Sequence, residues 1–393
     1  MAAYRTLDDL DVAGRRVLVR CDLNVPMRDG RVTDATRIER SLPTLRELAE
    51  RGARVIVLSH FGRPKGQIVP EMSLAPVAAA LAGALAREVG FLTLDEAGDA
   101  VGRLDDGQLV LLENLRFDPG EEANDIDFAR RLAALGELYV NDAFSCAHRA
   151  HASTEAIARL LPAAAGRAMQ AELDALGQAL AAPQRPVAAV VGGAKVSTKL
   201  AVLGHLLGRV DQLVIGGGMA NTFLAARGVE VGRSLCERDM LDTAREIMAA
   251  AQGRCEIVLP VDVVLASELT PGADTVTIAV DKVPAEMMIL DIGPRAALEL
   301  AERLSACRTL LWNGPLGAFE VPPFDAGTNE VARAAAELTR DGSLVSVAGG
   351  GDTVAALRQA DVLDDFTYVS TAGGAFLEWL EGKELPGVQV LTR

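Results

Sequence analysis

Short runs of apolar residues alternate with longer amphipathic segments along the whole chain. In the first half, the strand-like runs are residues 16–20, 54–59, 109–112 and 138–140. In the second half, they are residues 187–191, 212–215, 256–259, 309–312, 344–347 and 366–369. The helix-like segments between them include residues 35–50, 73–88, 195–207, 238–251 and 328–340. Apolar strands that alternate with helices are typical of parallel sheets covered on both faces, so an α/β fold is predicted.

The length of the chain and a proline-terminated helix predict two lobes. A chain of 393 residues is longer than a single hydrophobic core usually supports. An Ala-rich helical segment at 167–183 ends in proline, and the alternation of strands and helices restarts after Pro186. We therefore expect two Rossmann-like, three-layer αβα lobes with mostly parallel sheets, at residues 1–166 and 184–374, joined by this helix and a hinge.

The composition excludes several classes of protein. The formal net charge of −15 disfavours binding to nucleic acid or to an anionic membrane surface, so neither is an expected partner. The five cysteines are scattered without a Cys-x-x-Cys pair, which indicates neither a zinc site nor a disulfide framework. No signal-peptide pattern opens the sequence, and the longest apolar stretch, 74–86, is too short to span a bilayer. We expect a cytoplasmic protein.

Basic and amide side chains follow every predicted strand of the first half. The candidate site residues in these loops are Asp22 and Asn24 after the first strand, His60 and Arg63 after the second, Arg116 after the third and Arg149 after the fourth, with Arg37 near the start of the first helix. Ligands of open α/β sheets bind beyond the carboxyl ends of the strands, and Arg binds carboxylate and phosphate in bidentate fashion. A single Arg of this kind is often a solvated surface charge or an ion-pair partner. Their recurrence at strand ends favours a site for a small anionic metabolite.

Glycine-rich turns follow the strands of the second half. They are Gly192-Gly193, Gly216–Gly218, Asn313-Gly314 and Gly349–Gly351, and the last is followed by Asp352 and Thr353. Glycines before a helix allow backbone N–H groups to approach phosphate oxygens. Lys195 and Lys199 are predicted one turn apart on one helix face, where they add positive charge. Asp352 could hold Mg²⁺ with nucleotide phosphates, or serve only as a helix N-cap.

The separation of these two kinds of loop predicts phosphoryl transfer. The P-loop, a proper dinucleotide-binding G-x-G-x-x-G turn and the protein-kinase signatures are missing from the sequence. An NAD-dependent dehydrogenase, which is the main alternative enzyme, needs the dinucleotide turn. An anion half-site on one lobe and a nucleotide half-site on the other predict a kinase that closes about a hinge.

The chain resembles the phosphoglycerate kinase family in motifs that run through nearly its whole length. In the family's order, these are VRCDLNVP, SHFGRP, LLENLRFDPGEE, VNDAFSCAHRAHAS, GGAKVSTKL, GGGMANTFL, LWNGPLGAFE, GGGDT and STAGGAFLEWLEGKELPG. The resemblance implies a reversible, Mg²⁺-dependent transfer from 1,3-bisphosphoglycerate to ADP, giving 3-phosphoglycerate and ATP, without a covalent enzyme intermediate. It also implies a monomer whose tail, 375–393, packs back on the first domain.

The resemblance assigns roles to residues in both halves. For the 3-phosphoglycerate half-site it implies Asp22, Asn24, Arg37, His60, Arg63, Arg116 and Arg149. For the nucleotide half-site it implies Gly193, Lys199, Gly218, Asn313, Glu320, Gly349, Gly350, Gly351, Asp352 and Thr353. Within these sets, Glu320 would hold the ribose and Asp352 the Mg²⁺. Arg37, Lys195 and Lys199 would surround the phosphoryl group in transit as the catalytic residues.

A metabolite-binding scaffold without turnover remains the alternative from another class of protein. Such a scaffold would lose the transfer residues while its binding arginines remained. In this sequence Arg37, Lys195, Lys199, Glu320 and Asp352 are all present. An active enzyme is therefore favoured.

Overall fold

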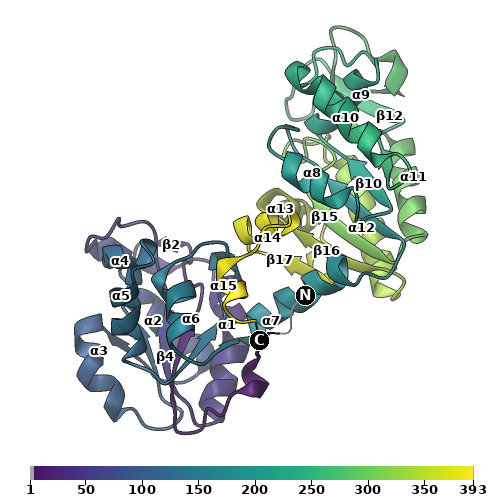
Figure 1. Cartoon of the computed structure of the whole chain (residues 1–393). Coiled ribbons are helices and arrows are strands. Elements are labelled where there is room, and N and C mark those ends of the chain that lie inside the picture. The colour runs from purple at the N-terminus through teal and green to yellow at the C-terminus, as the bar shows by residue number, and fades with distance from the viewer. Residues whose placement is uncertain (1–3, 393) are drawn as a thin grey trace. The chain divides into compact units, whose positions relative to one another are not determined.

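The computed structural model describes residues 4–392 and divides the chain into two compact units (Figure 1). Unit 1 is Met1–Leu173 together with Glu384–Arg393, and unit 2 is Asp174–Lys383. Each unit contains a six-stranded sheet in which all neighbouring strands are parallel. The predicted fold class, two αβα lobes with mostly parallel sheets, is confirmed.

The sheet of unit 1 has the strand order β5-β6-β4-β1-β7-β8. Its strands are β1 (Arg16–Arg20), β4 (Arg54–Leu58), β5 (Val89–Leu92), β6 (Leu109–Leu112), β7 (Leu138–Asn141) and β8 (Ala163–Ala165). A separate antiparallel hairpin consists of β2 (Met27–Arg28) and β3 (Arg31–Val32). All residues of β1 and β4 after the first are buried, as expected for strands covered by helices on both faces.

The helices of unit 1 surround this sheet (Figure 1). They are α1 (Thr36–Glu50), α2 (Ala75–Leu85), α3 (Leu94–Ala100), α4 (Pro119–Glu122), α5 (Ile126–Ala133), α6 (Ile157–Leu160), the start of α7 (Arg167–Leu176) and α15 (Pro386–Gln389). In α1, Ile38, Leu42 and Leu45 recur at helical spacing and are buried in the core. Burial of this face fixes the rotation of α1 and so places the neighbouring Arg37.

The C-terminal segment of unit 1 packs against the loop that follows β7. The backbone N–H of Gly387 donates to the carbonyl of Ala147 at 2.9 Å. The side-chain amide of Asn141 donates to the carbonyl of Gly387 at 3.1 Å. Leu385 and Leu391 are buried. The segment therefore braces a loop that carries predicted site residues.

The main sheet of unit 2 has the order β11-β10-β9-β15-β16-β17. Its strands are β9 (Val187–Val191), β10 (Gln212–Ile215), β11 (Glu256–Val258), β15 (Thr309–Asn313), β16 (Val345–Gly349) and β17 (Tyr368–Ser370). A smaller antiparallel sheet has the order β13-β12-β14 and consists of β12 (Asp262–Ala266), β13 (Val276–Ala279) and β14 (Met288–Ile292). Segments that follow the strands of the main sheet, and the strands β12 and β14 of the smaller sheet, line the cavity described below.

The helices of unit 2 complete its layers (Figure 1). They are α8 (Leu200–Leu206), α9 (Gly218–Ala226), α10 (Leu241–Ala251), α11 (Pro294–Ser305), α12 (Ala326–Arg340), α13 (Gly351–Gln359) and α14 (Gly374–Leu380). Trp312 is fully buried in the core, with its ring centroid 6.3 Å from that of Phe366. This packing fixes the end of β15, whose last residue is Asn313.

One predicted helix begins later than expected. The sequence pattern predicts a helix over 195–207, whereas α8 begins at Leu200. Polar side chains instead bond to backbone or to other side chains: the Thr198 hydroxyl donates to the carbonyl of Lys195 at 2.9 Å, and the Ser197 N–H donates to Glu237 at 3.0 Å. Such local bonds compete with a helical first turn. The prediction that Lys195 and Lys199 share a helix face is therefore wrong, since both lie in the turn before α8.

Candidate functional site

The first candidate cluster lies at the carboxyl ends of neighbouring strands in unit 1. β6, β4, β1 and β7 are consecutive in the sheet, so the loops that follow them meet at one edge. Hydrogen bonds and electrostatic contacts link six of the seven predicted residues to these loops or to the start of α1, namely Asp22, Asn24, Arg37, His60, Arg116 and Arg149. The seventh, Arg63, follows Gly62 in the loop after β4. The cluster contains four arginines and one carboxylate, which suits an anionic ligand.

Asp22 holds Arg37 at the centre of this cluster. The Nη1 of Arg37, in the first turn of α1, donates to both carboxylate oxygens of Asp22 at 2.9 and 2.7 Å. The Ser145 hydroxyl, from the loop after β7, also donates to Asp22. The side chain of Arg37 is 38 % exposed, so it remains accessible while Asp22 orients it.

His60 lies beside a buried guanidinium. Arg20, the last residue of β1, is fully buried and donates from Nη2 to the Nδ1 of His60 at 3.0 Å. Burial, followed by the positive charge of Arg20, lowers the pKa of His60 well below its ordinary value. The imidazole is thus neutral and is a hydrogen-bond donor or acceptor, with no charge of its own.

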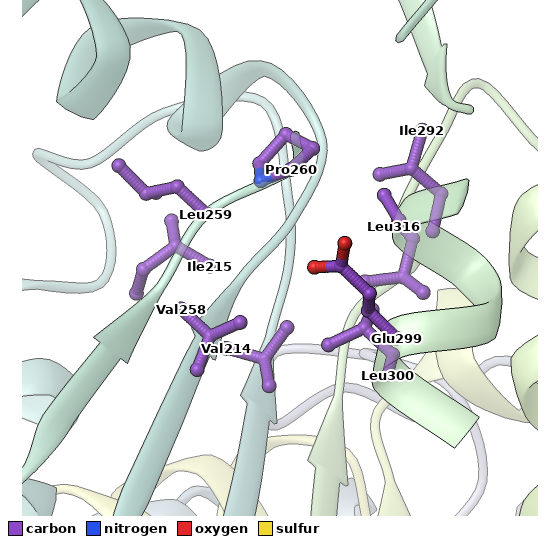
Figure 2. A pocket seen from close by; sticks show the side chains of 10 residues that line it. Val214, Ile215, Val258, Leu259, Pro260, Ile292, Glu299, Leu300 and Leu316 are labelled. Carbon is purple, nitrogen blue, oxygen red and sulfur yellow. The ribbon is translucent and has the colours of Figure 1, made fainter. Parts of the chain in front are cut away.

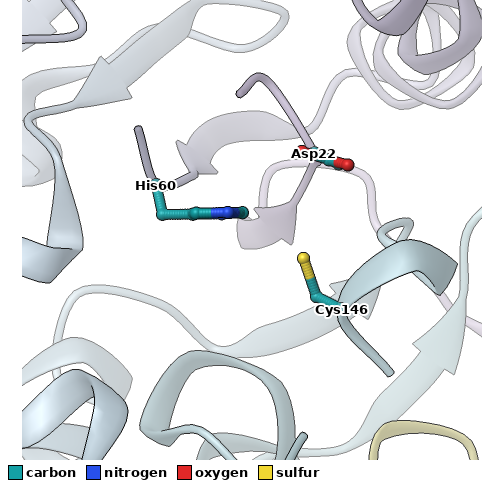
Figure 3. Close-up of side chains that lie close together, drawn as sticks. All are labelled: Asp22, His60 and Cys146. Carbon is teal, nitrogen blue, oxygen red and sulfur yellow. The ribbon is translucent and has the colours of Figure 1, made fainter. Parts of the chain in front are cut away.

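Three potential metal ligands approach one another here but do not form a credible metal site. Ligand atoms of Asp22, His60 and Cys146 lie within 4.8 Å of one another. Figure 3 shows these three side chains close together. However, Asp22 is already bound by Arg37, and the Nδ1 of His60 by Arg20. Burial also raises the pKa of the Cys146 thiol, so the thiolate that a metal requires is disfavoured. The arrangement fits an anion better than a cation.

Gly62 is held between two predicted site residues. Its N–H donates to the Oδ1 of Asn24 at 3.0 Å, and its carbonyl accepts from the Nη1 of Arg116 at 2.7 Å. The adjacent Arg63 is exposed. Arg149, also exposed, donates from Nε to the Nε2 of His148 at 3.2 Å. Two of the predicted arginines are therefore buried or paired within the cluster, and two face solvent.

A buried polar network beneath the cluster is not predicted by the sequence. Arg20 donates from Nε to the Ser153 hydroxyl at 2.8 Å, and that hydroxyl donates to Glu121 at 2.6 Å. Glu121 is completely buried. The one feature of the sequence that could have indicated this network is Arg20, a charged residue at the end of an otherwise apolar strand. A guanidinium buried there requires hydrogen-bond partners from other loops. Ser153 and Glu121 carry no signal of their own.

The second candidate cluster lies at the corresponding edge of unit 2. β10, β9, β15 and β16 are consecutive in the sheet, and each is followed by a predicted glycine turn. The turns approach one another closely, because a Cβ on Gly192 would lie 1.9 Å from the carbonyl oxygen of Pro315. Gly314 has a φ of 108°, which side chains rarely adopt. The glycines are therefore required by close backbone approach.

A glycine-lined cavity of about 330 Å³ opens at this edge. Gly193, Gly218, Glu320 and Asp352 are the predicted residues that line it, together with apolar side chains that include Leu235, Met288, Leu290 and Leu316. The combination of an apolar wall, glycine turns and two carboxylates suits an apolar ring with a polar, phosphorylated extension.

Asn313 joins the remaining predicted residues next to this cavity. Its side chain accepts a hydrogen bond from the ammonium group of Lys199 and donates to the carbonyl of Gly349 at 2.7 Å. The Thr353 hydroxyl accepts from the N–H of Gly314 at 2.7 Å. Burial lowers the pKa of Lys199, and the nearby Asp352 opposes this shift. Lys195 lies on the exposed turn before α8.

Asp352 lies in the first turn of α13 but does not cap it. The N-cap residue is Gly350, with a φ of 99°, and Gly351 and Asp352 follow as the first helical residues. The purely structural interpretation of Asp352 as an N-cap is therefore wrong. Its exposed carboxylate lines the cavity beside the glycine turn, where a divalent cation bound to phosphates would fit.

A second, apolar hollow adjoins the glycine-lined cavity. It lies between the ends of β10 and β11 and the helix α11, and Figure 2 shows the Glu299 carboxylate pointing toward it. It shares Pro260, Ile292 and Leu316 with the larger cavity. Its volume of about 10 Å³ is roughly that of a single water site. It is therefore a gap in the packing behind the cavity wall.

Within residues 4–392, none of the helices has the length and apolar character that a membrane span requires.

The sequence model of a family described as phosphoglycerate kinase matches residues 7–383. The chain is 61 % identical over 395 residues to a phosphoglycerate kinase of Rhizobium meliloti, with 99 % of each chain covered. It is 64 % identical over 394 residues to that of Rhizorhabdus wittichii, again with 99 % of each covered. Among solved structures, it is similar to phosphoglycerate kinase from Coxiella burnetii, with a TM-score of 0.94, 44 % identity and 99 % of each chain covered.

Proposed function

Because the chain belongs to the phosphoglycerate kinase family, we propose that its two clusters are the half-sites of that reaction. The enzyme transfers a phosphoryl group reversibly between 1,3-bisphosphoglycerate and ADP, with 3-phosphoglycerate and ATP as products, in glycolysis. Unit 1 would bind the phosphoglycerate and unit 2 the nucleotide. The observation that carries this proposal is the segregation of arginines at one sheet edge and glycine turns at the other.

In unit 1, the substrate carries a phosphate and a carboxylate, and the cluster offers donors for both. Arg63 and Arg149 are exposed cations, and Arg116 adds a buried one. Neutral His60 and Asn24 would contribute hydrogen bonds. Asp22 would orient Arg37 and accept the substrate hydroxyl.

In unit 2, the nucleotide would occupy the glycine-lined cavity. The apolar wall suits the base, and Glu320 would accept hydrogen bonds from the ribose hydroxyls. Gly349 ends β16, Gly350 is the N-cap of α13, and Gly351 and Thr353 lie in its first turn. The N–H groups of this helix start would therefore meet the phosphates. Gly193 and Gly218 would let the ligand approach the backbone closely.

The chemistry requires positioning and charge neutralisation more than a strong base. Toward ATP, a β-phosphate oxygen of ADP would attack the acyl phosphate and the carboxylate of 3-phosphoglycerate would leave. In reverse, that carboxylate would attack the γ-phosphate of ATP and ADP would leave. Neither nucleophile is a hydroxyl that has to be deprotonated. Arg37, Lys195 and Lys199 would neutralise the phosphoryl group in transit. We further propose that hinge closure brings the half-sites together for direct in-line transfer, since water must be excluded.

A magnesium ion fits the donor set of unit 2. Mg²⁺ usually takes one or two carboxylates together with substrate phosphates and water. Asp352 provides one exposed carboxylate next to the glycine turn. When bound, the ion would draw charge from the phosphate oxygens, while Lys199 and Asn313 hold the adjoining positions. We also propose that the enzyme acts as a cytoplasmic monomer.

A coupled assay of 3-phosphoglycerate-dependent ATP consumption, with and without Mg²⁺, tests the proposal on wild type and Lys199→Ala. We expect metal-dependent turnover, and a fall in kcat of about 10²-fold or more in the variant. Robust turnover by Lys199→Ala would remove Lys199 from the transfer step. Binding of 3-phosphoglycerate without turnover in wild type would favour a scaffold.

A further inference from the structure

Asp291 joins two segments of unit 2 at the wall of the glycine-lined cavity. It lies in β14, lines the cavity and is only 2 % exposed. Its Oδ2 accepts a hydrogen bond from the N–H of Gly327, in the first turn of α12, at 2.7 Å. Its Oδ1 accepts from the N–H of Ile292 at 2.8 Å. Backbone donors on both oxygens fix the orientation of the carboxylate.

The same carboxylate contacts the segment of chain that forms one wall of the cavity. Residues 315–318 all line the cavity. A Cβ on Gly317 would lie 2.2 Å from the Oδ1 of Asp291. The segment therefore approaches Asp291 more closely than any side chain at this position would permit.

Two further bonds hold this wall against the same elements. The N–H of Ala318 donates to the carbonyl of Leu290, the residue before Asp291, at 2.8 Å. The Thr328 hydroxyl of α12 accepts from the N–H of Gly317 at 3.3 Å. The wall is thus fixed between β14 and α12, and the side chain of Asp291, on β14, contacts both the wall and α12.

Stability alone gives a poor reason for a carboxylate at this position. Burial, with the charge of Asp325 acting in the same direction, raises the pKa of Asp291 to about 7. Keeping the group ionised at neutral pH is therefore unfavourable for folding. An amide would cost less to bury, but it has a single acceptor oxygen and would turn an NH₂ group toward one of the two backbone donors.

We propose that Asp291 is a positioning residue for the nucleotide: it fixes the wall formed by residues 315–318 in the shape that the base of the nucleotide requires. This inference rests on the proposed binding of the nucleotide in unit 2. Asp291 need not contact the phosphates or the reacting atoms, so its effect is expected on nucleotide binding and not on binding of 3-phosphoglycerate.

Kinetics of Asp291→Asn in the full chain, with each substrate varied in turn, test the role. We expect the nucleotide KM, and the Kd of ADP measured by calorimetry, to rise about tenfold, as for a lost hydrogen bond. The KM for 3-phosphoglycerate should stay within about twofold of wild type. A general loss of folded protein would lower the active fraction without changing either KM.

Asp262→Asn is the matched control. Asp262 is similarly buried, at 4 % exposure, and accepts from the N–H groups of Arg295 and Ala296 at 3.2 and 2.8 Å. It holds the start of α11 and is not among the residues that line the cavity. Its substitution should leave the nucleotide KM unchanged. Equal nucleotide effects of the two substitutions would overturn the proposal.

Two more variants keep the test decisive. If Asp291→Asn does not fold, Gly317→Ala displaces the same wall and should give the same selective rise in nucleotide KM. Glu320→Gln tests the placement of the nucleotide itself. A rise for Glu320→Gln without one for Asp291→Asn would refute the positioning role alone. No change for either would refute the nucleotide's placement and the inference with it.

Discussion

Arg20 donates a hydrogen bond from Nη2 to the Nδ1 of His60 at 3.0 Å. A guanidinium has no acceptor, so the Nδ1 of His60 carries no proton and the ring proton lies on Nε2. Burial and the charge of Arg20 lower the pKa of His60 well below its ordinary value. In the unit 1 cluster, His60 is therefore neutral and can donate a hydrogen bond from Nε2. Its tautomer is set by Arg20, which the ligand need not contact.

We expect native His60 to remain neutral at pH 6.5, where a free imidazole is half protonated, because its pKa is lowered well below the ordinary value. Nitrogen-15 NMR of the imidazole should report the Nε2–H tautomer at this pH, with the resonance assigned by its loss in His60→Gln. In the unfolded chain, His60 takes up a proton near pH 6.5. The lowered folded pKa thus makes the free energy of unfolding fall as pH drops below about 6.5, and His60→Gln should reduce this slope. Titration of native His60 near pH 6.5 would contradict the assignment.

Asp142 should make stability depend on pH in the opposite direction. It accepts from the N–H groups of Ala168 and Met169 at 2.9 and 3.2 Å, and burial raises its pKa to about 7. Between about pH 4 and pH 7, the unfolded chain has lost this proton and the folded chain retains it. Asp142 therefore lowers the free energy of unfolding as pH rises through this range.

Urea denaturation of Asp142→Asn between pH 5 and pH 8 measures this contribution. The stability of the variant relative to wild type should increase as pH rises, because the amide does not titrate. Asp262→Asn controls for the loss of a buried acceptor of two backbone bonds. A relative stability that is constant with pH would exclude titration of Asp142 in this range.

The main sheets could be predicted from the sequence because their strands are continuous apolar runs. The predicted limits of β1, β6, β9 and β10 agree with the structure. The pattern does not predict β8, which consists of three alanines, a residue that favours helices. Nor does it predict the β12–β14 sheet, in which β13 is partly exposed and tertiary pairing defines the strands.

Residues of the candidate site could be predicted where a charged or polar side chain closely follows a predicted strand. His60 and Asp352 satisfy this condition, since β4 ends at Leu58 and β16 ends at Gly349. Asp291 does not, because its role depends on contacts with Gly317 and Gly327, which are distant in sequence. Arg20 shows the same limit: its pairing with His60 depends on the register of neighbouring strands.

Truncation after Lys383 should weaken unit 1 and its anion cluster. It removes the buried Leu385 and Leu391, each worth about 1.5–3 kcal/mol of burial. It also removes the bonds from Gly387 to the loop after β7. We expect a lower denaturation midpoint and a higher KM for 3-phosphoglycerate, with an unchanged Kd for ADP.

A point substitution provides a milder version of the same test. A Cβ on Gly387 would lie 2.9 Å from the Cα of Ala147. Gly387→Ala should therefore raise the KM for 3-phosphoglycerate in the same direction with less loss of stability. A truncated chain with wild-type KM and midpoint would show that the segment does not brace the loop.

Two glycines of unit 2 should respond oppositely to alanine. Gly314 has a φ of 108°, and its Cβ would lie 2.2 Å from the carbonyl oxygen of Gly192. Gly314→Ala should lower the free energy of unfolding by about 2 kcal/mol or more. Gly204 lies inside α8, where a Cβ would meet no atom of another residue within 4 Å apart from its own helix backbone and chain neighbours. Gly204→Ala should raise the free energy of unfolding by about 0.5–1 kcal/mol.

Urea denaturation and nucleotide kinetics of the two variants test whether the glycine turns are built for close approach. Gly314 donates its N–H to Thr353 beside the cavity, so Gly314→Ala should also raise the nucleotide KM, whereas Gly204→Ala should not. If both variants instead had a higher denaturation midpoint than wild type, the backbone entropy of the unfolded chain, and not steric contact, would dominate at both positions. A stable Gly314→Ala with normal nucleotide binding would show that the turn after β15 can open without loss of the site.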